Sequence, residues 1–107
     1  MENNGKKIES LMDGLGFKMT TKGTPAIRRA VEIVVENPDA MMTKEVYPVI
    51  AGARGEWGRV ERNMRTAIAA AARSPGWDEA WRGMGGWGIP TNAELIRRIA
   101  REVRDAD

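Results

Sequence analysis

The segment between residues 59 and 73 constrains the fold of this chain more than any other. Its apolar residues recur at intervals of three and four, which is the period of one buried face of an α-helix. This apolar face consists of Val60, Met64, Ala67, Ile68 and Ala71. A second face carries arginines separated by small residues, and it consists of Arg59, Arg62, Thr66, Ala69 and Arg73, with Arg65 beside it. The pattern predicts one helix that packs on a core and presents guanidinium groups on its other side.

An arginine-rich helix face of this kind can enter the major groove of DNA, although the solvated surface of an ordinary helix has the same pattern. The formal net charge is only +2. Residues 54–73, however, carry five arginines against two glutamates, an excess of three positive charges. Residues 91–107 carry four arginines against four carboxylates and are therefore balanced. The positive charge is concentrated on one predicted helix.

Two residue types are missing from the chain, and their absence limits its chemistry. There is no cysteine and no histidine, which excludes disulfides and thiolate metal sites and removes the commonest general base. We therefore expect no enzyme, no metal and no cofactor.

The start of the chain lacks the apolar core of a signal peptide, and the longest apolar run, 67–72, is too short to span a bilayer. We expect a cytoplasmic protein without a membrane contact.

The rest of the chain also has helical periodicity, without the alternation that marks a strand. The first helix ends near Gly16, and the second begins at Thr24-Pro25, with the threonine hydroxyl as its cap, and ends at Asn37-Pro38. Thr43 is expected to cap the third helix. That helix contains Pro48, which should cost a hydrogen bond or bend it, and its inward residues are Val46, Tyr47, Val49, Ile50 and Ala51.

In the C-terminal third of the chain, the sequence pattern predicts a short helix followed by a longer one. Ser74-Pro75-Gly76 should end the arginine helix, and residues 77–82 should form one or two helical turns before a glycine-rich loop. Thr91 and Glu94 form a capping box, and Leu95, Ile96, Ile99, Ala100 and Val103 follow as an inner face. We expect the arginines of this last helix to form a solvated face paired with Glu94 and Glu102; they are Arg97, Arg98, Arg101 and Arg104.

A helix over Thr43–Ala53 followed by a basic helix over Glu56–Arg73 gives a helix-turn-helix at about residues 43–73. Four sequence blocks in order then resemble a known family: Lys22-Gly23, the run 43–51, Arg59-Val60-Glu61-Arg62 with Arg65 and Ala67-Ile68, and the run 90–96. From about Ile8 to Val103 the chain resembles the C-terminal DNA-binding domain of the sporulation-initiation response regulator. The resemblance implies an all-α, six-helix domain, here over residues 1–107, whose third and fourth helices form the helix-turn-helix.

The resemblance also implies roles for individual side chains. Glu61 and Arg62 would face base edges, which fits the bidentate bonding of arginine to guanine and the acceptance by glutamate from cytosine. Contacts with the DNA backbone or groove are expected from Lys44, Arg59, Arg65, Thr66 and Arg73.

The chain departs from the family pattern in three places. The turn 55–58 is one residue shorter than expected and lacks hydroxyl residues, and the segment 77–89 is shorter and rich in tryptophan. The tryptophans are expected in the core or an interface, with Trp57, just before the arginine helix, as the one to watch. The receiver domain is absent, so we expect either a standalone relative or an excised effector domain.

The sequence therefore favours a sequence-specific regulator of transcription that binds double-stranded DNA. The alternative is a protein-interaction module that pairs with or antagonises a full-length regulator without reading DNA. The expected partners are double-stranded DNA, a second copy in tandem on the DNA, and RNA polymerase. We expect a monomer in solution, because the apolar faces suffice for one small core.

Overall fold

The computed structural model describes residues 4–52 and 55–105, and this part of the chain is all-helical. A single π-helical turn, η1 (Met42–Val46), leads into the third helix. The six α-helices are α1 (Asn4–Leu15), α2 (Thr24–Glu36), α3 (Tyr47–Ala51), α4 (Trp57–Ala71), α5 (Trp77–Gly83) and α6 (Asn92–Asp105). The described residues contain no strand, and the expected all-α fold with a helix-turn-helix is confirmed.

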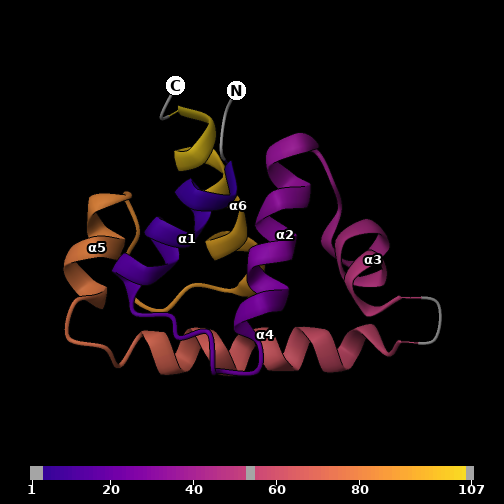
Figure 1. Ribbon diagram of the computed structural model, residues 1–107, viewed down its shortest axis with the longest axis horizontal. Coiled ribbons are helices and arrows are strands. Elements are labelled where there is room, and N and C mark those ends of the chain that lie inside the picture. The colour runs from indigo at the N-terminus through magenta and orange to yellow at the C-terminus, as the bar shows by residue number, and fades with distance from the viewer. Residues whose placement is uncertain (1–3, 53–54, 106–107) are drawn as a thin grey trace.

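The longest helix, α4, forms the base of the molecule (Figure 1). α2 and α6 pack on α4 and on each other, and α1 packs on α2, α5 and α6. α3 adjoins the N-terminal end of α4, while α5 lies beyond its C-terminal end (Figure 1). This arrangement covers the upper side of α4 and leaves its lower side open.

The apolar faces predicted from the sequence meet in one core. On α4, Met64, Ala67, Ile68 and Ala71 are buried, whereas Val60 is only partly buried at the edge. The predicted inner face of α6 is buried throughout. Burial of about 25 cal/mol per Å² of apolar surface is the main force holding α4 in place.

Two tryptophans fill the space beside α1. Trp77 and Trp81 are almost fully buried, and their rings stack with centroids 5.6 Å apart. Phe17 meets Trp77 edge-on at 6.5 Å. Trp87, in contrast, is 74% exposed, and the guanidinium of Arg82 lies 4.6 Å from its ring centroid. The short C-terminal segment thus supplies both core and surface aromatics.

The expected helix ends are partly confirmed. α1 ends before Gly16, which has a φ of 98°, and α2 ends before Asn37-Pro38. The capping role of Thr24 was predicted wrongly: Gly23 is the N-cap, and the Thr24 hydroxyl is buried without a hydrogen-bond partner. The reason is a close approach, because a Cβ on Gly23 would collide with the carbonyl of Asn63 in α4. The start of α2 is therefore set by packing on α4.

The third helix differs most from its prediction. The helical stretch begins one residue earlier than Thr43, at Met42, and the predicted end at Ala53 lies outside the described residues. Thr43 does not cap it; instead the carboxylate of Glu45 accepts a 3.0 Å hydrogen bond from the Met41 N–H. The π turn adds a residue to one turn and rotates the faces that follow. Val49, expected inside, is therefore 57% exposed.

Pro48 lies at the second position of α3, directly after the π turn. Because η1 and α3 are continuous, its nitrogen cannot donate the helical hydrogen bond to the preceding turn, as its position in the sequence predicted. The expected bend is thus replaced by a change of helix type at the junction of η1 and α3.

Three of the four arginines of α6 donate to backbone carbonyls and not to the expected glutamates. Arg97 donates to the carbonyls of Pro38 and Ala40 at 3.2 and 2.8 Å. Arg98 donates to the Met84 carbonyl at 2.8 Å and Arg104 to the Val34 carbonyl at 3.3 Å. Among the described residues, the ion pair on α6 joins Arg101 to Asp105 at 3.9 Å. The prediction of pairs with Glu94 and Glu102 was wrong, because carbonyls at the ends of α2 and α5 face these side chains.

Candidate nucleic-acid interface

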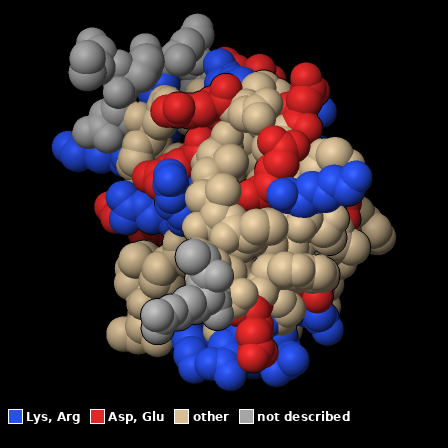
Figure 2. Space-filling view, turned by 90° about the vertical axis from the view of Figure 1, so that its right-hand side faces the viewer, with Lys and Arg blue, Asp and Glu red and all other residues tan. Residues whose placement is uncertain are grey.

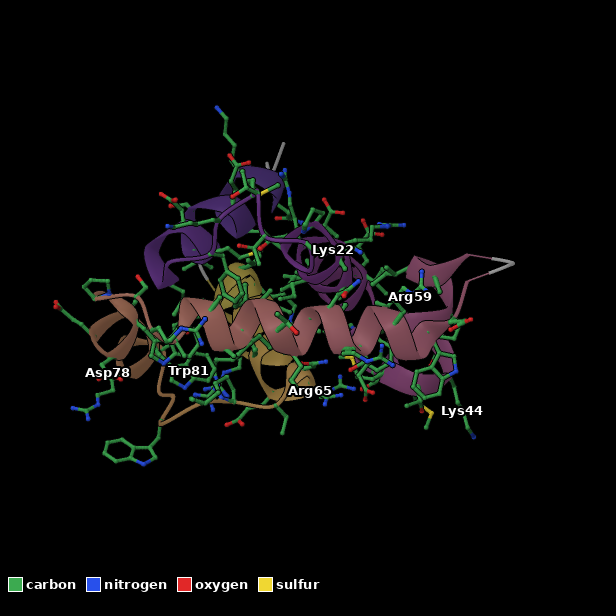
Figure 3. The ribbon with its side chains drawn as sticks, turned by 90° about the horizontal axis from the view of Figure 1, so that it is seen from below. Lys22, Lys44, Arg59, Arg65, Asp78 and Trp81 are labelled. Atoms are coloured by element: carbon green, nitrogen blue, oxygen red, sulfur yellow. The ribbon has the colours of Figure 1, made fainter. Side chains whose placement is uncertain are left out.

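The open side of α4 carries the arginines singled out in the sequence. Arg59, Arg62, Arg65, Thr66 and Arg73 are all exposed. Figure 3 looks at this side from below, with α4 in front of the rest of the molecule. The structure thus places six of the seven predicted contact residues on α4 or directly after it, and the sixth is Glu61.

Arg62 and Glu61 have different positions on this surface. Successive residues of an α-helix are about 100° apart, which puts Arg62 near the middle of the exposed face and Glu61 at its edge. Glu61 is only partly exposed, and its carboxylate lies 3.4 Å from the guanidinium of Arg65. An exposed pair of this kind contributes about 0.3–0.5 kcal/mol. The carboxylate can therefore exchange this partner for another donor at little cost.

Lys44 lies apart from the arginines. It is exposed on η1, and in Figure 3 it lies beside the N-terminal end of α4, on the opposite flank from Lys22. Lys44 therefore belongs to a segment that borders α4, and not to α4 itself.

An aromatic pair fixes the first turn of α4 against α3. The rings of Tyr47 and Trp57 stack at a centroid distance of 5.9 Å and an interplanar angle of 12°. Tyr47 is buried, while Trp57 remains 42% exposed. Aromatic pairs of this geometry contribute about 0.5–1.5 kcal/mol beyond the area they bury. Trp57 thus has a structural contact and an exposed edge beside the arginine face.

A second contact holds the N-terminal third of α4, and no sequence pattern predicted it beyond the neighbouring capping box. The side-chain amide of Asn92, at the start of α6, donates to the carbonyl of Glu61 at 2.9 Å and to the Tyr47 hydroxyl at 3.4 Å. Burial raises the pKa of the Tyr47 phenol, an effect that the Asn92 hydrogen bond opposes. Asn92 therefore links α3, α4 and α6 at the residue that precedes Arg62.

The capping of α6 supports this arrangement. The Thr91 hydroxyl accepts a 3.1 Å hydrogen bond from the Glu94 N–H, as the capping box predicted. Because the cap fixes the first turn of α6, it also fixes Asn92 against α4.

Charge gathers on the open side of the molecule. In Figure 2, lysine and arginine side chains cluster at the lower edge, where α4 runs, and acidic side-chain atoms lie among them. A helix with this charge, an open outward face and rigid support on its other sides can fit a DNA major groove.

No helix in the described part of the chain has the length and apolar character needed to cross a membrane.

Comparison with protein families agrees with this geometry. Residues 8–103 match the family described as the sporulation initiation factor Spo0A C terminal. The match covers α2 to α5 completely and most of α1 and α6. Members of this family are helical DNA-binding effector domains of transcription regulators. With nearly its whole length matched, the chain belongs to the family of Spo0A C-terminal domains.

Proposed function

We propose that this chain is a sequence-specific regulator of transcription that binds double-stranded DNA through α4, with residues 1–107 acting as one domain. Arg62 and Glu61 read base edges in the major groove. Arg59, Arg65, Thr66 and Arg73 contact phosphates or groove walls, and Lys44 contacts the backbone. The observation that carries the proposal is the exposed face of α4, on which arginines surround the central Arg62.

A second candidate is an interaction module that pairs with or antagonises a full-length regulator without binding DNA. The exposed hydrophobic residues at the two ends of the molecule, Val49 and Trp87, favour it. The arginine face favours DNA, because among the described residues only Arg65 of these arginines has a carboxylate partner. A surface that serves only protein contacts has no need for such unpaired positive charge.

Selection of bound sequences from a pool of random duplexes tests the proposal. We expect one enriched motif, bound about 10³-fold or more tightly than random duplex at physiological salt. The Arg62→Ala variant, taken through the same selection, should lose enrichment at one base pair. A pool that remains random, together with weak binding that is equal for all duplexes, would contradict the proposal and favour the interaction module.

We also expect a monomer in solution that binds neighbouring sites cooperatively. Occupancy of a doubled site should exceed the sum expected from single sites, because the first bound copy raises the local concentration of contacts for the second. Light scattering of the free protein and titration of duplexes with one or two sites would measure both properties. A tight dimer without DNA, or independent binding at every spacing, would overturn this expectation. A contact with RNA polymerase stays a prediction.

A further inference from the structure

The loop between α1 and α2, residues 16–23, lies against α4 on the flank opposite Lys44. The contact is close, because a Cβ on Gly23 would collide with the carbonyl of Asn63. Figure 1 shows the loop descending to the level of α4 and crossing it. In Figure 3, Lys22 lies on one side of α4 and Lys44 on the other. The arginine face is therefore bordered by a separate chain segment on each side.

A groove of about 410 Å³ separates the loop from the C-terminal half of α4. Lys18 and Thr21 line it from the loop, and Arg73 lines it from the end of the helix. The wall formed by α4 consists of small side chains, among them Ala67 and Ala70. Because these side chains are short, the groove stays open between cations on its two sides.

The loop itself is basic and polar. It contains two lysines and two threonines and no carboxylate. Lys18 and Lys22 are both exposed, and within the described residues neither forms an ion pair with a carboxylate. Unpaired lysines beside an open groove are suited to phosphate oxygens, which they bind as point charges.

We infer that this loop binds the phosphodiester backbone of the DNA strand along one wall of the major groove, through Lys18 and Lys22. The inference rests on the proposed function. An α-helix with its side chains is about 10–12 Å across and fills a major groove of about 12 Å. Segments on the two flanks of α4 then meet the phosphates of opposite strands. The loop takes one strand, with Arg73 beside it, and η1 with Lys44 takes the other.

The double variant Lys18→Gln/Lys22→Gln tests this inference. The slope of log K against log salt should become less steep by about 1.8, because each lost phosphate contact changes it by about 0.9. Binding to the preferred duplex and to random duplex should weaken by the same factor, since phosphates carry no sequence information. The ratio of the two affinities should therefore stay unchanged.

A matched control removes the same charge elsewhere. Arg29→Gln/Arg101→Gln also lowers the net charge by two, and both arginines are exposed and away from α4, each in a local pair with a carboxylate. This control should leave the slope nearly unchanged, and Lys18→Arg/Lys22→Arg should keep the wild-type slope. If the lysine and the control variants change the slope equally, the loop makes no phosphate contact and the inference is wrong, while the proposed function stands. If the wild-type chain binds no duplex, both fail.

Duplexes with single neutral methylphosphonates locate the contact. Some neutral positions on one strand should weaken wild-type binding but have no effect on the Lys18→Gln/Lys22→Gln variant, because the interacting charge is already gone. If every neutral position weakens both proteins to the same extent, the loop touches no particular phosphate, which would also overturn the inference.

Discussion

Replacing Trp81 by alanine should lower the free energy of unfolding by about 3–5 kcal/mol, the range for removing a buried aromatic ring. Trp81 is 1% exposed and stacks on Trp77. A Cβ on Gly86 would collide with its ring, which shows how closely the following loop covers it. The variant loses this burial and leaves a cavity at the end of α4.

Trp87→Ala is the matched control for this prediction. Trp87 is 74% exposed and has its cation–π contact with Arg82, which contributes about 0.5–1 kcal/mol at an exposed site. Urea unfolding followed by circular dichroism would compare the two variants. A total stability of about 5–15 kcal/mol is typical of a small domain, so Trp81→Ala should shift the midpoint strongly and Trp87→Ala only slightly. Equal shifts of the two unfolding midpoints would contradict the burial of Trp81 in the core.

Arg62→Ala should weaken binding to the preferred duplex by about 1–3 kcal/mol and relax the preference at one base pair. Arg62 lies in the middle of the exposed face of α4, where a bidentate contact with guanine is within reach of the groove floor. The measurement is a titration of the preferred duplex and of versions with each base pair replaced. The loss should be concentrated on the preferred sequence, because random duplex offers no matching base edge.

Arg73→Ala should behave differently. Arg73 lies just beyond α4 and lines the groove beside Lys18, so it should weaken binding to all duplexes evenly and reduce the salt slope by about one. Circular dichroism of both variants controls for folding, since both residues are exposed. If the two substitutions change preferred and random binding by the same factor, the division into base-reading and phosphate-binding arginines is wrong.

The sequence predicted most of the fold because its apolar periods are local signals. The limits of α4 differ from the prediction by one residue at the start and two at the end, and Gly16 ends α1 as expected. The exposure of Val49 could not be predicted, because it depends on the π turn before it. A π turn arises from how a segment is held by its neighbours and leaves no periodic mark in the sequence.

For the candidate site too, one part could be predicted from the sequence and another part could not. The arginine face of α4 follows from helical spacing alone, and the structure leaves it exposed as that spacing implies. The hydrogen bond from Asn92 to the Glu61 carbonyl joins residues 31 positions apart. The close approach that requires a glycine at position 23 is between Gly23 and Asn63. Contacts between distant residues of this kind have no local pattern, so their partners become visible only when the helices are placed in space.

The arginine anchors of α6 have a consequence for how this domain can diverge. Their acceptors are the carbonyl oxygens of Val34, Pro38, Ala40 and Met84, and every amino acid supplies such an oxygen. Mutations at these four positions can change the side chain and leave the acceptor in place. Arg97 has no such freedom, because its two terminal nitrogens reach two different carbonyls and lysine lacks the planar fork of donors. Of the four acceptor positions, only Pro38 is exposed and can change its side chain without disturbing the core, because Val34, Ala40 and Met84 are buried.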